Sequence, residues 1–538
     1  MITQPFHSMK GFSNLFSDLL QSAPYISSRF PTLDDTFENY MRNKALRCDR
    51  EKLTQVLQAS LSHLDLTEKQ QHNLHLAGLQ NTMAVVTGQQ VGFLGGPLYT
   101  LYKAYSAIAQ AEKLQAQYQS FNVIPLFWIE DNDHDRNEAA EAYILDKQGM
   151  PQQIICPADT TLSVQTPVSE LSITDDISAV LTALEQHLPE NEYTRDLMPL
   201  LHTIYTVGTE WSVAFMRLLQ HWCGEKGLLF VRASDIRKSG AFASIVKQEL
   251  AHPMRILETV QKVNNELRNN GYTPQVEPSA VNLFYHDGTT RKKINYESSR
   301  FHAGEKIWTQ DEIIQEAKES PEHFSPNVLL RPLCQDDLLP TCMYIAGPGE
   351  CGYLAQIKEC YSLFDIEMPV IHARHSATLL LSQHQRLLDK VQKSPLFFMR
   401  KYHEIEQDIA HDMSDKDLEL LYQQAQQDLE QVLAPITHYA GNTDQSLNAA
   451  AAAAQKTIYD TLDTLKKKIT ASKKRQEQTS FDRAKTLSNF LYPNGTAQER
   501  TYSPIALLTK VSWQTFHETL TSLTALSNQS HYIITFTH

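Results

Sequence analysis

The chain has 538 residues, with 48 Lys and Arg residues against 62 Asp and Glu residues, which gives a formal net charge of −14. This acidic balance disfavours sequence-independent binding to nucleic acid, which needs a dense basic surface to neutralise phosphates. With 42% hydrophobic and 20% charged residues, the chain can bury more than one core and is not typical of a disordered protein. We therefore expect roughly three domains, or one large fold with an appendage.

The sequence has no apolar run long enough to span a bilayer, and its first residues show no basic region followed by a continuous apolar stretch. Its seven cysteines are odd in number and widely spread, which favours a reducing compartment over a disulfide framework. We therefore expect a cytoplasmic protein that binds neither a membrane nor nucleic acid.

The pattern of apolar residues changes along the first part of the chain. Residues 1–80 have helical spacing, and residues 83–96 (MAVVTGQQVGFLGG) form a short β-rich run that ends in glycines. A helical pattern over residues 97–114 and a second apolar run, FNVIPLFWI, follow. Strand, glycine loop, helix and strand begin a parallel α/β sheet, whose ligand site is expected where the strands end.

The α/β pattern resumes twice after interruptions. Residues 145–200 and about 270–320 are interpreted as connecting insertions, and the second contains a hairpin turn at Asp287-Gly288. A helix and strand are predicted within residues 211–235, and the strands MYIAG and PVIHA within residues 325–380, separated by a helix over GYLAQIKECYSLF.

After residue 380 the composition shifts towards Gln, Lys, Asp, Glu, Leu and Ala. Apolar residues recur there at coiled-coil spacing, and they predict two long antiparallel helices joined around Tyr439–Ser446. The seam residues are Leu418, Leu421, Ala425, Leu429, Val432 and Ile436 on the first helix and Ile458, Leu462, Leu465 and Ile469 on the second. The basic groups Lys466–Lys468 and Lys473–Arg475 are interpreted as a solvated helix face rather than a nucleic-acid stripe.

These observations divide the chain into four parts. We expect a helical N-terminal segment (1–80), an α/β core with insertions (81–380), a coiled-coil arm (381–490) and a C-terminal segment that packs back on the core (491–538). The turn and polar triplet in LYPNGTAQER (491–500) either dock the arm onto the core or contribute a second ligand site.

The most informative motif is TGQQVGFLGGPLYTLYK (Thr87–Lys103). Its glycines allow the backbone to approach a ligand closely, and the following helix directs free N–H groups to the same place. It has neither the GxGxxG nor the Walker A spacing. The motif predicts a site for an anionic or nucleotide ligand, with a merely tight loop as the alternative.

A cluster of acids, EDNDHD (Glu130–Asp135), follows the second strand. Closely spaced carboxylates raise one another's pKa, which favours a general base, a cation site or an amine site over a solvated strand end. Cys334, Cys342, Cys351 and Cys360 lack the CxxC spacing of zinc sites and are expected to be buried thiols, so no metal site is predicted from them.

Five long segments, in order, resemble the BshC-like cysteine ligases of bacillithiol biosynthesis. They are VVTGQQVGFLGGPLYTLYKA, PLFWIEDNDHD, SPNVLLRPLCQDDLLPTCMYIAGPGECGYLAQIK, PVIHARHSATLL and LYPNGTAQER. The resemblance implies an α/β fold with a Rossmann-like parallel sheet related to class I aminoacyl-tRNA synthetases, insertions and a C-terminal antiparallel helical coiled coil. It also implies a homodimer.

The resemblance implies that cysteine is joined to the amine of glucosaminyl malate in the last step of bacillithiol biosynthesis. Amide formation from a free carboxylate is uphill in water, so we expect ATP to activate cysteine, with Mg²⁺ as the candidate metal. The HxGH and KMSKS signatures are absent, which leaves an already activated donor open. The alternatives are a degenerate synthetase-like interaction protein and a nucleotidyltransferase acting on another small acid.

In this reading Asp133, His134 and Asp135 bind or deprotonate the ammonium group, Lys103 adds positive charge near phosphate, and Arg331 and Arg374 take the malate carboxylates. The residues expected to bind substrate or nucleotide are Thr87, Gly88, Gln89, Gln90, Gly96, Tyr99, Lys103, Trp128, Arg331, Gln335, Gly347, Glu350, Tyr353, Gln356, Arg374 and Ser376.

Overall fold

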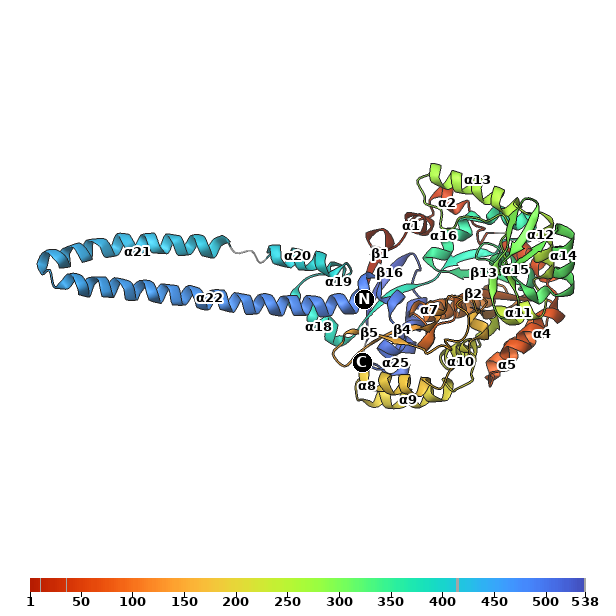
Figure 1. Ribbon diagram of the computed structural model, residues 1–538, viewed down its shortest axis with the longest axis horizontal. Helices are drawn as coiled ribbons and strands as arrows, with labels where there is room; N and C mark the ends of the chain where they lie inside the picture. The colour runs from red at the N-terminus through yellow and green to blue at the C-terminus, as the bar shows by residue number, and fades with distance from the viewer. Residues whose placement is uncertain (10, 35, 413–415, 537–538) are drawn as a thin grey trace. The chain divides into compact units, whose positions relative to one another are not determined.

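The computed structural model describes residues 1–9, 11–34, 36–412 and 416–536, without the side chains of residues 410–419 and 473–477 (Figure 1). The chain divides into two units, Met1–Ser382 with Thr496–His538 and Gln383–Gly495. Within the described ranges, no helix combines the length and apolar character needed to cross a bilayer.

The first unit is built on a five-stranded parallel sheet with the order β14-β13-β2-β3-β6. Its strands are β2 (Thr82–Gln90), β3 (Asn122–Glu130), β6 (Leu229–Arg232), β13 (Thr341–Ala346) and β14 (Val370–Ala373). The chain moves outward from β2 through β3 to β6 and then returns to the other side of β2. Strand order therefore reverses between β2 and β13, which is where open α/β sheets bind ligands. The predicted parallel α/β core is confirmed.

Helix α6 (Tyr99–Gln117) packs on the sheet through one apolar stripe. Ala107, Ala111 and Leu114 recur at helical spacing and pack with Met83 and Val85, which alternate along β2. This packing fixes α6 against the sheet, so the first turns of the helix lie beside the carboxyl end of β2.

The glycine loop between β2 and α6 serves packing. Gly95 has φ of +88°, and a Cβ there would lie 2.6 Å from Cζ3 of Trp222. A Cβ at Gly92 would lie 2.7 Å from Cα of Gly96. Glycine is required at these points because the chain folds closely upon itself and upon a tryptophan.

The N-terminal segment is mostly helical, as predicted, and also contains a strand. Its helices are α1 (Asn14–Leu20), α2 (Pro24–Ser27), α3 (Phe37–Arg47), α4 (Arg50–Leu61) and α5 (Glu68–Ala77). Strand β1 (Ile2–Pro5) pairs antiparallel with β16 (Ser530–Thr535), which pairs parallel with β15 (Ser376–Leu380). This three-stranded sheet joins segments far apart in the chain, which no local pattern encodes.

The connections between the core strands carry the remaining elements of the first unit. Between β3 and β6 lie α7 (Arg136–Ala140), β4 (Glu141–Leu145), β5 (Pro151–Ile155), α8 (Ile177–His187), α9 (Glu192–Ile204) and α10 (Trp211–Cys223). Helices α11 (Ala233–Lys238), α12 (Ala243–Ala251) and α13 (Arg255–Asn269) follow β6. Strands β7 (Leu283–His286) and β8 (Arg291–Lys293) form the hairpin predicted at Asp287-Gly288.

The second insertion and the end of the core complete the unit. The insertion continues with β9 (Asn295–Glu297), β10 (Arg300–Ala303), β11 (Lys306–Trp308), α14 (Gln310–Glu319), β12 (Phe324–Pro326) and α15 (Arg331–Leu338). The helix predicted over GYLAQIKECYSLF is two helices, α16 (Pro348–Gln356) and α17 (Lys358–Leu363), because it breaks at Ile357. The last helices are α23 (Gln498–Thr501), α24 (Ile505–Leu508) and α25 (Trp513–Thr524).

The second unit contains the two long helices that the heptad spacing predicts. Helices α21 (Lys416–Thr443) and α22 (Leu447–Leu491) lie side by side in Figure 1, with the turn where it was expected. Shorter helices precede them: α18 (Ser382–Val391), α19 (Pro395–Phe398) and α20 (Tyr402–Asp412).

Several of the apolar seam residues on these two helices are exposed in the single chain. Leu421 is 67% exposed, Val432 61% and Leu465 53%. A helix pair covers only the side of each helix that faces its neighbour, so these apolar side chains stay in solvent. The side chains of Leu418 and of Lys473–Arg475 lie outside the described residues.

Candidate active site

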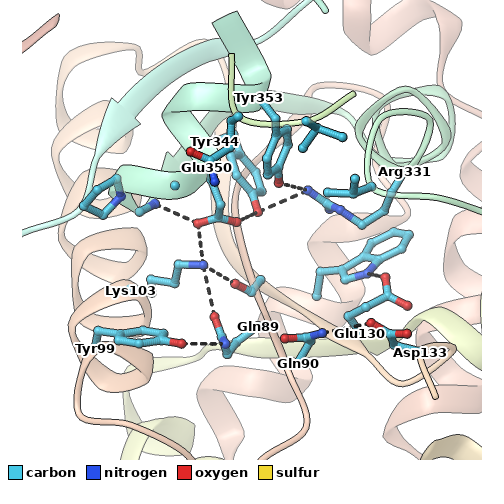
Figure 2. A pocket seen from close by; sticks show the side chains of 18 of the residues that line it. Gln89, Gln90, Tyr99, Lys103, Glu130, Asp133, Arg331, Tyr344, Glu350 and Tyr353 are labelled. Carbon is cyan, nitrogen blue, oxygen red and sulfur yellow. Dashed lines mark hydrogen bonds and ion pairs between the residues drawn. The ribbon is translucent and has the colours of Figure 1, made fainter. Parts of the chain in front are cut away.

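A cavity of about 400 Å³ lies at the carboxyl ends of the core strands, at the reversal of strand order (Figure 2). Its wall includes Gly88–Gln90 from β2, Trp128 and Glu130 from β3, and Tyr344 from β13. The volume falls in the range of small-molecule sites, which is about 300–1,000 Å³. The sheet therefore places the cavity where the sequence predicted a ligand.

Lys103 and Glu350 form a buried ion pair in this wall. Lys103 Nζ lies 2.5 Å from Oε2 of Glu350 and also donates to the carbonyl oxygen of Gly88 at 2.6 Å and to Oε1 of Gln89 at 3.3 Å. Glu350 in turn accepts from the hydroxyl of Tyr344 at 2.7 Å. Figure 2 shows this chain of contacts joining β2, α6 and α16.

These contacts fix the charge state of the pair. Burial lowers the pKa of Lys103, which Glu350 partly offsets. Burial alone would raise the pKa of Glu350, but Lys103 outweighs it and holds that pKa below its ordinary value. All three ammonium donors of Lys103 are engaged within the chain, so Lys103 holds the wall together. That Lys103 adds positive charge near a phosphate stays a prediction.

Arg331 has only uncharged hydrogen-bond partners. Its guanidinium donates to Oε1 of Gln335 at 2.9 Å, to the hydroxyl of Tyr353 at 3.1 Å and to that of Tyr344 at 3.4 Å. Within the described part of the chain no carboxylate lies within 4.0 Å of it. Because Arg331 is 8% exposed and lines the cavity, it is a buried cation available to an anionic ligand.

Arg374 also lines the cavity, but its charge is balanced by Glu499. Its Nη2 donates to Oε1 of Glu499 at 2.6 Å and its Nη1 to Oε2 at 3.1 Å. Burial would raise the pKa of Glu499, and Arg374 reverses this and lowers it. Arg374, predicted to bind a carboxylate of the substrate, already binds one from the chain itself.

The last residues of the LYPNGTAQER segment belong to the first unit, where they contact the core and the cavity. The Gln498 side chain bonds to the backbone of Leu379 at both its oxygen and its nitrogen, and Glu499 pairs with Arg374. The next residue, Arg500, lines the cavity. Residues 498–500 therefore help to complete the wall of the cavity within the first unit.

The acidic cluster is divided by the fold. Asp133 lies in the wall, where it accepts from Nη1 of Arg291 at 3.1 Å and from Nε2 of Gln90 at 2.9 Å. Asp135 lies outside the wall and caps α7 through a bond to the backbone of Glu138.

Three further members of the cluster take separate roles. His134 lies outside the wall with its ring 6.4 Å from that of Phe284. Asp131 is fully buried against Ser234, and burial raises its pKa to about 6. Glu130 lines the cavity. Of the three predicted catalytic residues, the structure brings only Asp133 to the cavity.

Several other predicted binding residues lie behind the wall or away from it. The Thr87 hydroxyl donates to the carbonyl oxygen of Ile345, Gln356 bonds to Asn264 and Val276, and Ser376 bonds to Glu499 and His531. The predicted residues that do not line the cavity are Thr87, Gly96, His134, Asp135, Gln335, Gln356 and Ser376. The predicted residues that do are Gly88, Gln89, Gln90, Tyr99, Lys103, Trp128, Asp133, Arg331, Gly347, Glu350, Tyr353 and Arg374.

Sequence reasoning did not select six charged or polar members of the wall, which are Glu130, Gln275, Arg291, Asn327, Tyr344 and Arg500. Glu130 lies in the acidic cluster and Arg500 in LYPNGTAQER, so their motifs signalled them. Tyr344 belongs to the strand MYIAG. Arg291 reaches the site from the second insertion, beside a hairpin turn, where no spacing relates it to the core strands.

The four clustered cysteines are free and buried, as predicted. Burial raises the pKa of Cys342 and of Cys360 to about 12 in each case. Within the described residues no three His, Cys, Asp or Glu side chains are grouped as metal ligands would be.

The charges of the cavity wall do not fully cancel. Its charged residues are Lys103, Glu130, Asp133, Arg291, Arg331, Glu350, Arg374 and Arg500. The pairs Lys103–Glu350, Arg291–Asp133 and Arg374–Glu499 account for most of them. Arg331, Arg500 and Glu130 have no partner of opposite charge within 4.0 Å among the residues that the structure describes. The wall thus has two available cations and one available carboxylate.

The sheet order and this cavity define a Rossmann-like protein with a charged small-molecule site. Two family models together match nearly all of the chain. The model "Bacillithiol biosynthesis BshC, N-terminal Rossmann-like domain" matches residues 1–375, and "Bacillithiol biosynthesis BshC, C-terminal coiled-coil domain" matches residues 377–536. The chain therefore belongs to the BshC family of bacillithiol biosynthesis.

Curated relatives are similar to this chain over most of its length, as the family models are. The chain is 32% identical to the "Putative cysteine ligase BshC" of Salinibacter ruber, over 86% of this chain and 85% of that protein. It is 29% identical to the protein of that name from Chlorobaculum tepidum, over 98% and 97% of the two chains. Its identity to the one from Lysinibacillus sphaericus is 28%, over 88% of each.

Proposed function

We propose that this chain is a ligase that joins the carboxyl group of cysteine to the amine of glucosaminyl malate, with ATP activating the carboxyl group. The name shared by the relatives supports cysteine as one substrate. The observation that carries the proposal is the charge left unpaired in the cavity, because Arg331 and Arg500 offer two cations to a ligand that carries two malate carboxylates.

Activation is required because a carboxylate does not form an amide in water unaided. ATP supplies an adenylate leaving group when it is bound. Gly347 and Gly349 line the cavity at the start of α16, and Gly347 has no side chain to accept the N–H groups of the first turn. These N–H groups would hold phosphate oxygens of the bound ATP. The only role that we propose for Mg²⁺ is to bind the phosphates of ATP.

The remaining wall residues orient the substrates. Burial raises the pKa of Tyr353 to about 12, so its hydroxyl stays protonated beside Arg331 and can donate to the same carboxylate. The Lys103–Glu350 pair holds the ends of β2 and α16 at a fixed separation. This keeps the cysteine carboxyl group and the acceptor amine aligned for reaction.

We expect the purified protein to form bacillithiol from ATP, cysteine and glucosaminyl malate, and Arg331→Lys to raise KM for glucosaminyl malate about 10-fold or more. Lysine keeps the charge but not the paired N–H donors, and a charged hydrogen bond contributes about 1.5–3 kcal/mol. Steady-state kinetics with the product measured by mass spectrometry checks this.

The matched control is Arg300→Gln, which removes an exposed arginine of β10. Its KM should equal that of the wild type. Failure of the wild-type protein to form bacillithiol would refute the proposed activity, and an unchanged KM in Arg331→Lys would refute the role of Arg331.

We also propose that the chain forms a homodimer. Leu421, Val432, Ile436 and Leu465 are exposed apolar side chains on the long helices, and a second copy would remove them from water. Light scattering should give twice the 61.2 kDa mass of the chain. A mass of one chain at micromolar concentration would contradict it.

A further inference from the structure

Glu130 is the acid of the cavity wall that has no cation within 4.0 Å among the residues that the structure describes. It ends strand β3, where it pairs in register with Gln90 of β2. Its Oε2 accepts from Nε1 of Trp128 at 3.0 Å, and its Oε1 accepts from the backbone N–H of Asn132 at 3.2 Å. Each carboxylate oxygen has room for a further donor, so the group can receive an N–H from a ligand.

Asp133 differs from Glu130 in this respect. Its Oδ1 is bonded to Arg291 and to the backbone N–H of His134, and its Oδ2 to Gln90. The guanidinium of Arg291, 6% exposed, balances the charge of Asp133. A ligand ammonium would therefore gain less at Asp133 than at Glu130.

Glu130 and Arg331 contact the same indole. The guanidinium carbon of Arg331 lies 5.8 Å from the ring of Trp128, whose N–H is bonded to Glu130. The wall thus presents a free carboxylate and a free guanidinium around one aromatic side chain. A ligand that carries an amine and a carboxylate complements this arrangement, as does an amino sugar that bears an organic acid.

We propose that Glu130 binds the ammonium group of the acceptor substrate and is the base that deprotonates it. This inference rests on the proposed function for the identity of the acceptor. The Glu130 carboxylate takes one proton from the ammonium group, and the free amine attacks the carbonyl carbon of activated cysteine. The new C–N bond forms as the C–O bond between the cysteine carbonyl carbon and AMP breaks, and AMP departs with that electron pair. The second proton leaves the nitrogen for solvent.

The charged groups that face Glu130 come from three segments. They are Arg331 of α15, Arg291 of β8 and Asp133 of the loop after β3. Burial raises the pKa of Glu130 although both arginines oppose it. The carboxylate form should thus be lost as the pH falls towards that raised pKa, and kcat/KM should fall with it.

Binding measurements separate this role from catalysis. By calorimetry without ATP or cysteine, wild-type protein should bind glucosaminyl malate at least 10-fold more tightly than its N-acetyl form, whose nitrogen carries no charge. Glu130→Gln should bind the two compounds within 2-fold of each other. Asp133→Asn, the control within the same wall, should keep most of the wild-type preference.

The outcomes distinguish this inference from the proposed function. Tight binding of glucosaminyl malate with an unchanged preference in Glu130→Gln, or a preference lost only in Asp133→Asn, would overturn the role of Glu130 alone. No binding of glucosaminyl malate by the wild type would overturn both. Glu130→Gln should unfold at the wild-type temperature or above it, because burial disfavours the charge that it removes. Its kcat/KM should also lack the fall at acid pH that is expected for the wild type.

Discussion

Glu499→Gln should lower the free energy of unfolding by about 3–5 kcal/mol, because it leaves the guanidinium of Arg374 buried without a counter-charge. Both side chains are almost fully buried, at 2% and 0% exposure, and Glu499 also accepts from the hydroxyl of Ser376 at 2.8 Å. Urea unfolding at pH 7 measures the loss. Glu518→Gln, at an exposed glutamate of α25, is the control and should change stability by less than about 0.5 kcal/mol.

The pH dependence of stability provides a second test of the Arg374–Glu499 pair. The pKa of Glu499 in the folded chain lies below its ordinary value of 4.5. Its stabilisation is therefore present at neutral pH and is lost as the pH falls from 4.5 through the lower folded value. The stability gap between wild type and Glu499→Gln should narrow over that window. A gap below 1 kcal/mol at pH 7 would contradict the role assigned to the pair.

Lys103→Met should reduce bacillithiol formation about 100-fold or more and also destabilise the protein. The substitution leaves the buried carboxylate of Glu350 without its cation and releases the ends of β2 and α16 that Lys103 joins. Displacement of a positioning group by about 1 Å can cost 100-fold in rate. Rates are measured by mass spectrometry of the thiol product, and stability by thermal unfolding.

Two variants make this prediction specific. Lys113→Met removes an exposed lysine further along the same helix and should behave as the wild type. The double variant Lys103→Met/Glu350→Leu removes both charges, so it should recover part of the lost stability without recovering activity. Full activity in Lys103→Met would refute the positioning role.

The strand ends of the site could be predicted from the sequence because local patterns encode them. Apolar runs identified β2 and β3, and the residues just beyond or within their ends, Gln89, Gln90 and Trp128, line the cavity as expected. Parallel strands bring their carboxyl ends to one edge of the sheet, so identifying the strands was enough to bring these side chains together.

The pairing of charges could not be predicted in the same way. Arg374 and Glu499 are 125 residues apart, and Asp133 and Arg291 are 158 apart. Residues this far apart in the sequence follow no spacing rule that would predict their contact. As a result, Lys103 and Arg374 line the cavity as expected, but the acid of the chain that balances each of them could not be predicted. The function of the glycines at 92 and 95 was likewise hidden, because Trp222 contacts the loop from a distant helix.

Glu130 shows both what local sequence patterns encode and what depends on tertiary contacts. The acidic cluster contributes Glu130 and Asp133 to the cavity wall, but the residues predicted within it were Asp133, His134 and Asp135. Tertiary contacts separate the members, since Asp135 caps α7 and Asp133 pairs with Arg291, which leaves Glu130 unpaired. Six consecutive residues contain no signal that assigns these different partners.

The most direct test of the central claim supplies the wild-type protein with ATP, glucosaminyl malate and cysteine labelled with ¹⁸O at both carboxyl oxygens. We expect bacillithiol that retains one ¹⁸O in its amide carbonyl, and AMP that carries the other. Bacillithiol formed with unlabelled AMP would contradict activation of cysteine as an adenylate, and the absence of bacillithiol would contradict the assignment of the cavity as the site of a cysteine ligase.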